Sequence, residues 1–328
     1  MHKVFAKAVG LVTLGVACWG LAARYVPATN HLVLLSAVLA PYLLMFAPLA
    51  ALLLAIFGRR MFVVALVVTL VAVAVMVPLY RSSKPGQAEH VVRVMSANVY
   101  GGYADPADLV KSAAAQADVL AVQELTPEFV ENLTVAGIDA AFPHRWLDPR
   151  DGASGSGLWS RYPLSDTRRI DGFSMAFLSA RIELSGSVIN PMVLVVHLPG
   201  PWPQPIGEWR HDMDRLPATL SDTADQAGDS AVIVAGDFNS SLDVLQFRAL
   251  LRNGYRDAAE QSGAGFTPTY PAHWPLPPAI TIDHILTRNC TATSLHTIRL
   301  PGSDHRGIIS SVALDTPASN PRKAVPPG

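Results

Sequence analysis

Hydrophobic and polar positions divide the chain into two unlike parts. Three long apolar runs, 8–26, 32–57 and 61–80, follow one another within the first 80 residues. A helix needs about 20 apolar residues to cross a bilayer, so the runs predict a region of about three transmembrane helices over residues 1–80. Pro41 and Pro48 lie inside the second run, and proline is tolerated in spans where neighbouring helices satisfy the freed backbone groups.

After residue 80 the pattern changes to short apolar stretches separated by polar and glycine-rich segments. Residues 81–90 read as a polar linker with a Pro-Gly break, and the proline-rich residues 316–328 have the composition of a disordered tail. Between them, 91–315 alternates strand and helix patterns, which predicts an α/β domain. Strands are predicted at 91–98, 119–122, 180–184, 192–196, 231–236, 280–286 and 308–314, and helices at 106–116, 209–227 and 243–251, the last capped by Asp243.

Charge separates the same two parts. No acidic residue precedes Glu89, whereas the chain from Glu89 onward carries all 26 acidic residues and 18 of the 25 basic ones, a formal net charge of −8. A domain of that charge lacks the basic surface typical of proteins that bind nucleic acids. Arginines clustered between residues 145 and 169 could still form a local track, so a nucleic-acid substrate stays an alternative that is not favoured.

The basic residues of the first part predict its orientation in a membrane. They precede the first span and fill the loop between the second and third spans: Lys3, Lys7, Arg59 and Arg60. Because basic loops stay in the cytoplasm, the domain is expected on the extracytoplasmic side of a multi-pass cell-membrane protein. Arg81 and Lys84, which follow the third span, favour the opposite orientation. If the first run were a cleaved signal peptide, the two remaining spans would still place the domain outside.

Polar side chains follow the predicted strands where each strand ends. The clearest case is Gly236-Asp237-Phe238-Asn239, which ends the apolar run from Ala231. Each such residue alone is more often turn chemistry or a solvated surface group. Their recurrence at equivalent strand ends predicts one shared site, composed of Asn98, Glu124, His197, Asp237, Asn239, Asp283, His284, Asp304 and His305.

These residue types suit phosphoester hydrolysis assisted by a hard cation. Glu124 and Asp304 are oxygen donors of the kind that Mg²⁺ or Mn²⁺ prefers. No cluster of histidine and cysteine at zinc-ligand spacing occurs, and no phosphate-binding P-loop motif occurs.

The remaining polar groups fit the handling of water and phosphate. Asp237 and Asn239 could align or deprotonate an attacking water. His197 and His305 could donate hydrogen bonds to phosphate oxygens as negative charge develops there. Asp283 is expected to hold the tautomer of His305 and to favour its protonated form.

Seven short motifs carry a family resemblance. They are SANV at Ser96–Val99, QE at Gln123-Glu124, GLWSRYPL at Gly157–Leu164, VVHL at Val195–Leu198, GDFN at Gly236–Asn239, IDHIL at Ile282–Leu286 and GSDH at Gly302–His305. In this order they resemble the endonuclease/exonuclease/phosphatase superfamily of DNase I-like and exonuclease III-like hydrolases. The resemblance implies a four-layer α/β sandwich, in which two packed β-sheets are flanked by helices, and a metal-dependent phosphohydrolase.

The resemblance also implies roles for individual residues. Glu124 would bind the metal with help from Asn98, and Asp283 and Asp304 would complete the carboxylate set around His305. Asp237 and Asn239 would position the water, while Asn98, His197 and Asn239 would contact the substrate. No position of these motifs is substituted in this chain.

Three functions follow as hypotheses. The first is a membrane-tethered phosphodiesterase or phosphatase acting outside the cytoplasm on a phosphoester, with a lipid headgroup as one candidate. The second is an extracytoplasmic nuclease, and the third is a binding module that kept the fold without turnover, which the complete set of polar residues disfavours. One core in this superfamily serves many phosphoesters, so sequence leaves the substrate, the number of metals and the oligomeric state open.

Overall fold

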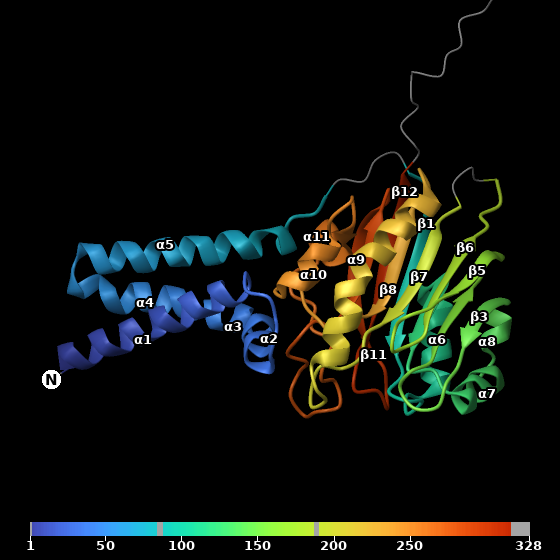
Figure 1. Cartoon of the computed structure of the whole chain (residues 1–328), viewed down its shortest axis with the longest axis horizontal. Helices are drawn as coiled ribbons and strands as arrows, with labels where there is room; N and C mark the ends of the chain where they lie inside the picture. The colour runs from blue at the N-terminus through green and yellow to red at the C-terminus, as the bar shows by residue number, and fades with distance from the viewer. Residues whose placement is uncertain (1, 84–87, 187–189, 316–328) are drawn as a thin grey trace, which may run out of the picture.

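A computed structural model describes residues 2–83, 88–186 and 190–315. Figure 1 shows two parts side by side, a bundle of helices and a larger domain built on two β-sheets. The predicted tail at 316–328 and part of the linker, 84–87, lie outside the described residues.

The bundle contains three helical stretches long and apolar enough to cross a membrane, namely Val4–Ala23, Ala40–Phe57 and Arg59–Tyr80. Their helices are α1 (His2–Ala23), α3 (Ala40–Leu44), α4 (Phe46–Leu54) and α5 (Arg59–Met76), with short 3₁₀ turns at Ala55–Phe57 and Val77–Tyr80. In Figure 1, α1 and α5 both begin at the end of the bundle far from the domain. The basic residues at those two helix starts are therefore separated from the domain by the length of the bundle.

The second apolar run is not one helix from residue 32 to residue 57. Its first part forms a separate helix, α2 (His31–Val38), which ends where Leu39 leaves helical geometry (φ −88°, ψ 4°). Pro41 lies in the first turn of α3, where a missing N–H costs nothing, so a new helix starts there. Figure 1 shows α2 lying across the domain end of the bundle instead of along it.

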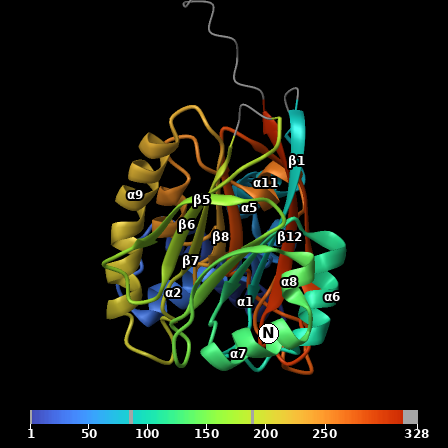
Figure 2. The ribbon, with the colours of Figure 1, turned by 90° about the vertical axis from the view of Figure 1, so that its right-hand side faces the viewer.

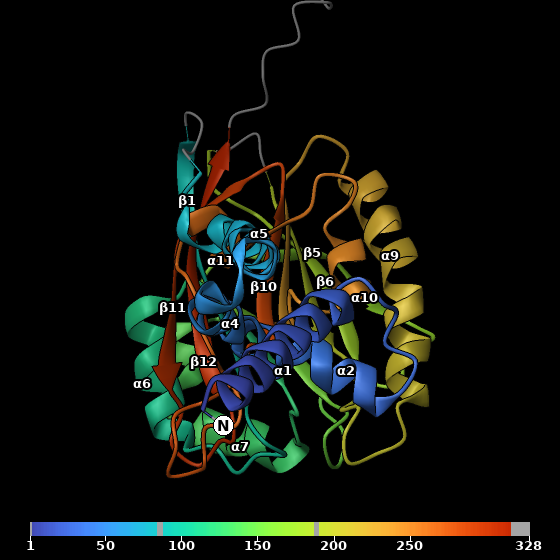
Figure 3. The same ribbon diagram turned by 90° about the vertical axis from the view of Figure 1, so that its left-hand side faces the viewer.

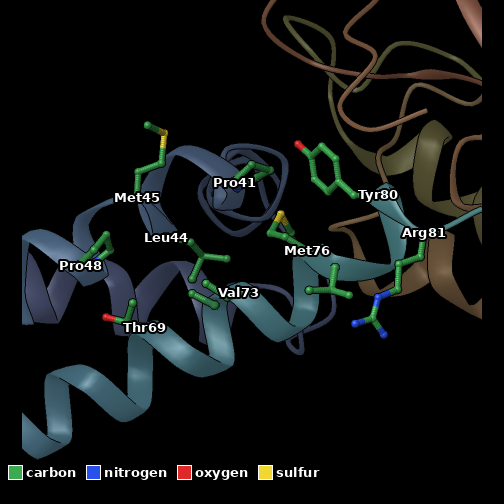
Figure 4. Close-up of a pocket in the computed structure, with 11 residues that line it drawn as sticks. Pro41, Leu44, Met45, Pro48, Thr69, Val73, Met76, Tyr80 and Arg81 are labelled. Atoms are coloured by element: carbon green, nitrogen blue, oxygen red, sulfur yellow. The ribbon is translucent and has the colours of Figure 1, made fainter. Parts of the chain in front are cut away.

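An apolar groove of about 540 Å³ runs between α3, α4 and α5 (Figure 4). Its walls include Leu44, Val73 and Met76, and Arg81 lies at the end nearest the domain. The groove contains none of the strand-end polar residues, so it belongs to the bundle and not to the predicted site.

The domain is a sandwich of two mixed sheets. In the described residues the first has the strand order β11-β12-β1-β2-β4-β3 and the second β5-β6-β7-β8-β10-β9. The first sheet consists of β1 (Ala88–Asn98), β2 (Val119–Gln123), β3 (His144–Asp148), β4 (Ser156–Ser160), β11 (Thr291–Arg299) and β12 (Arg306–Asp315). The second consists of β5 (Leu164–Ile170), β6 (Phe177–Ile182), β7 (Met192–His197), β8 (Val232–Asp237), β9 (Arg256–Asp257) and β10 (Asp283–Arg288).

Helices cover both outer faces, which gives the expected four layers (Figure 2). The first sheet packs against α6 (Pro106–Gln116), α7 (Pro127–Val135) and α8 (Ile138–Ala141), and the second against α9 (Gly207–Ala227) and α10 (Leu245–Leu250). A short helix, α11 (Ala258–Ser262), packs against β11 and the turn that ends the bundle. The core between the sheets is formed by Val92, Leu158, Val193, Ile233 and Ile285, among others. The fold predicted from the sequence is confirmed.

The bundle and the domain share a buried interface. Arg24, at the end of the first span, forms an ion pair with Asp243, and both side chains are at most 10% exposed. Asp243 is therefore not the cap of the helix predicted at 243–251, because α10 starts at Leu245 with Val244 in the cap position. The chain between α1 and α4 also touches two domain loops: His31 Nε2 lies 2.8 Å from the carbonyl of Pro201, and Tyr42 donates to the carbonyl of Ala279 over 2.6 Å. Figure 3 looks along the bundle and shows its helices in front of the domain.

Candidate active site

Polar strand ends from both sheets meet at one edge of the sandwich. In the second sheet, His197 of β7 and Asp283 of β10 each lie directly beside Asp237 of β8 in the strand register. Asn98 ends β1 in the first sheet and reaches across to Asp237, with Nδ2 to Oδ2 at 3.0 Å. This hydrogen bond joins the two sheets at the site.

Four carboxylates crowd this edge: Asp237, Asp283 and Asp304 are buried and Glu124 is half-buried. These four residues are called the carboxylate cluster below. Their side chains are between 1% and 17% exposed. The amide of Asn98 also donates to Glu124 over 3.1 Å. His197 Nε2 lies 4.0 Å from Glu124 and 3.9 Å from Asp237, so it stands between two members of the cluster.

The backbone at two site residues adopts an uncommon conformation. Glu124 has φ +60° and Asn239 has φ +46°. Asparagine is common in the left-handed region but glutamate is not, and such geometry concentrates at functional sites. Two hydrogen bonds hold Asn239 in this conformation. Its backbone N–H donates to Asp237 over 2.8 Å, and its side-chain amide donates to the carbonyl of Leu198 over 2.8 Å. These turns direct both side chains toward the cluster.

His305 and Asp283 form a buried pair. The Nδ1 atom of His305 lies 2.9 Å from Asp283, and its Nε2 atom lies 3.7 Å from Asp237 and 3.9 Å from Asp304. Burial alone would lower the pKa of His305, but Asp283 and Asp237 outweigh it and raise the pKa to about 10. His305 is thus an imidazolium whose Nε2–H faces the centre of the site.

His197 differs from His305 in the direction of its pKa shift. Burial, with the nearby positive charge of His305, lowers the pKa of His197 to about 4. It is therefore a neutral imidazole at neutral pH, and its bonding to a substrate would come from a single N–H.

Burial makes it costly to keep the acids of the carboxylate cluster charged without a compensating cation. Burial raises the pKa of Asp237 to about 8, and burial likewise raises the pKa values of Glu124 and Asp304. The buried Oδ1 atoms of Asp283 and Asp304 accept no hydrogen bond from any described residue. Orphaned oxygens among crowded acids are the environment in which a hard divalent cation binds, so the residues fit Mg²⁺ or Mn²⁺.

The geometry separates the better ligands from the poorer ones. Ligand atoms of Asp237, Asp283 and His305 lie within 4.8 Å of one another. His305 Nδ1 is already bonded to Asp283, and a protonated ring binds no metal. The NH₂ group of Asn98 orders two of the carboxylates, and its amide oxygen accepts from the backbone N–H of Tyr100. The amide oxygen keeps a second lone pair, so the help of Asn98 in metal binding stays a prediction. Glu124 and Asp304 remain the predicted metal carboxylates.

The structure brings all the predicted site residues together except one. His284 points away from the site, into a buried pocket where it bonds to Asp257 over 2.8 Å and packs on Phe247. Neighbouring residues of a strand face opposite sides of the sheet. His284 directly follows Asp283 in β10, so its side chain lies on the side opposite to that of Asp283. The roles assigned to the others stay predictions.

Two contributors were not singled out in the sequence. Ser303 Oγ donates to the carbonyl of Asn98 over 2.8 Å and accepts the N–H of His305 over 3.0 Å, which ties two site strands together. Tyr270 packs its ring 5.0 Å from the ring of His305. Only the spacing of Ser303 two residues before His305 gave a signal, since serine at that offset commonly bonds to the backbone.

Comparisons with known proteins identify the family and support the fold. A family model described as Endonuclease/Exonuclease/phosphatase family matches residues 95–305, which is more than half of the chain. D. rerio TDP2, solved in complex with a single-strand DNA product, is 23% identical with a TM-score of 0.56, covering 68% of this chain and 99% of its own. A Bacteroides thetaiotaomicron protein of the endonuclease/exonuclease/phosphatase family is 13% identical with a TM-score of 0.55, covering 71% and 100%. A search of curated proteins gives no match.

The cluster predicts that a divalent cation stabilises the fold through Glu124. At Mg²⁺ near 100-fold its dissociation constant, binding adds about 2.7 kcal/mol, or a rise in Tm of roughly 5–10 °C for a domain of this size. Glu124→Gln should lose more than half of that rise while keeping its bond to Asn98. In chelator the variant should melt at the same temperature or higher, because it removes a buried negative charge.

Thermal unfolding of the full-length protein in detergent, with and without Mg²⁺, measures this. Glu128→Gln, an exposed change on α7, is the matched control and should behave as the unaltered protein. An equal Mg²⁺-dependent rise in Glu124→Gln and in the unaltered protein would remove Glu124 from the metal site.

Proposed function

Because the chain belongs to the endonuclease/exonuclease/phosphatase family, we propose that it is a membrane-anchored, divalent-metal-dependent phosphoester hydrolase with an extracytoplasmic catalytic domain. The observation that carries the proposal is the carboxylate cluster with two histidines, His197 and His305, whose Nε2 atoms lie 3.9 Å and 3.7 Å from Asp237. The cluster can collect a cation, and the histidines can contact a phosphate bound beside it.

Asp237 is placed to act on the attacking water. Its Oδ1 is fixed by the N–H of Asn239, and its Oδ2 by the amide of Asn98. A carboxylate held from both sides is oriented before the substrate arrives, which is the condition for general-base assistance. Asn239 stands beside it to align the same water.

The histidines are placed to stabilise charge on the phosphate. Asp283 fixes His305 in its charged form, so its Nε2–H can be donated to a non-bridging oxygen as negative charge grows there. His197 offers a neutral N–H from the opposite side of Asp237. When bound, Mg²⁺ or Mn²⁺ would supply Lewis-acid stabilisation at the same oxygens, held by Glu124 and Asp304.

The arrangement of the two parts favours a substrate near a membrane surface. The loop that contains Pro201 and the loop that contains Ala279 both contact the segment between the first and second spans. Trp202 and Trp274 in these loops are about 60% exposed. A phosphoester carried by a lipid headgroup is the substrate class that this position suits best.

A nuclease is the second candidate. It is supported by D. rerio TDP2, whose structure contains a single-strand DNA product. The net charge of −8 from Glu89 onward weighs against it, because binding a polyanion depends on counterion release by basic groups. Assays of the full-length protein with phospholipid headgroups, DNA and RNA separate the two.

Loss of the Asp237 or the His305 side chain should slow the chemical step of hydrolysis. Asp237→Asn should lower kcat by about 10²–10⁴-fold, the usual contribution of a general base. His305→Ala should lower kcat more than it raises KM, by about 10²–10³-fold, since its donor acts on charge that develops in the transition state. Asp283→Asn should give a milder form of the His305 defect.

Steady-state hydrolysis by the full-length protein measures these changes, with His211→Ala on α9 as an exposed histidine control. The variants should keep far-UV circular dichroism and melting within a few degrees of the unaltered protein. A folded His305→Ala protein with near-normal kcat would contradict the mechanism.

The orientation has its own test. Basic residues at the starts of α1 and α5 and their distance from the domain support an extracytoplasmic domain. An alkaline phosphatase of the periplasmic type should be active when it is fused after Gly328. A green fluorescent protein fused at the same position should be dark, because it would be exported with the domain. The reverse pattern would place the domain in the cytoplasm.

A further inference from the structure

A second cavity, of about 580 Å³, lies beside the candidate active site. One wall is the loop 272–278, and the other is the end of β11, the turn that follows it and the start of β12. Both walls lie at the edge of the domain where β1 ends (Figure 1). No residue that lines the cavity is acidic.

Two arginines face this cavity from adjacent strands. Arg299 of β11 and Arg306 of β12 are direct partners in the antiparallel register, and both line the cavity. Like charges directly opposite on one sheet face destabilise the strand pair unless something compensates them. Neither guanidinium lies within 4.0 Å of a carboxylate among the described residues.

The cavity is connected to the catalytic groups through its own walls. Ser303, which lines it, contacts both Asn98 and His305. Ala272 on the opposite wall donates its N–H to the carbonyl of Asp304 over 2.6 Å. The cavity and the candidate active site therefore share residues of the turn between β11 and β12.

We infer that Arg299 and Arg306 form a subsite for a second phosphate group of the substrate. Guanidinium groups bind phosphate oxygens with two parallel hydrogen bonds, so two of them can hold one dianion and relieve their mutual repulsion. The inference rests on the proposed function, and it narrows the substrate to phosphoesters that carry another phosphate close to the scissile one. His273, on the same wall as Ala272, offers a further donor.

The first test uses binding and not activity. In EDTA no divalent cation can draw inorganic phosphate to the carboxylate cluster, so the phosphate binding that is lost when both arginines are replaced reports on the arginines. Isothermal titration of the full-length protein in detergent should show saturable binding. The double variant Arg299→Gln/Arg306→Gln should weaken it at least tenfold, and Arg252→Gln, an exposed arginine elsewhere, should not. No saturable binding, or equal affinity in the double variant, would overturn the subsite.

The second test assigns the source of the phosphate. With Mg²⁺, the ratio of kcat/KM for inositol 4,5-bisphosphate, whose two phosphates are on neighbouring carbons, to that for inositol 4-phosphate should fall at least tenfold in the double variant. If instead that ratio is unchanged and nanodiscs containing phosphatidic acid compete with inorganic phosphate, the arginines bind a lipid headgroup of the bilayer and the substrate assignment is wrong.

The two tests also keep the proposals apart. Phosphate binding that depends on the arginines, together with no hydrolysis of any phosphoester, would contradict the proposed function and with it the assignment to a substrate. Hydrolysis with no arginine-dependent binding would contradict the subsite alone.

Discussion

Four acidic side chains crowded at one edge of a β-sandwich, three of them buried and Glu124 half-buried, are the constraint on which this structure depends. Charged carboxylates removed from water are costly unless they are paired, and here one imidazolium, His305, faces several of them. Burial accordingly raises the pKa values of Glu124, Asp237 and Asp304. A bound divalent cation would offset this charge, so the proposed metal dependence and the cost of burying the acids would have the same origin.

The sandwich builds this cluster from strand ends that are far apart in sequence. Asn98 of the first sheet bonds to Asp237 of the second, so the site exists only when the sheets are packed together. The site also requires that β7 and β8 approach each other closely. A Cβ at Gly236 would lie 1.8 Å from the carbonyl oxygen of Val196, so only glycine permits this approach. Glycine at this position lets His197 and Asp237 end their strands side by side.

The sequence predicts most of the elements of the domain and the residues of its site. It does not predict contacts between residues that are far apart along the chain. Buried strands such as β7 and β8 are continuous apolar runs, and Asp105 with Pro106 marks the start of α6, so these elements could be located. Motif order then predicted the fold and the site residues. Arg24 and Asp243, 219 positions apart, gave no local signal of their pairing, and Asp243 looked like a helix cap. The side of the sheet taken by His284 was likewise missed, because the short motif around it gives no strand register.

The central claim is that the carboxylate cluster works through a divalent cation. The most direct measurement is phosphoester hydrolysis by the full-length protein after metal removal, with bis(4-nitrophenyl) phosphate and 4-nitrophenyl phosphate as simple substrates. Activity should disappear in EDTA and return in proportion to added Mg²⁺ or Mn²⁺. Undiminished hydrolysis in EDTA would contradict the account.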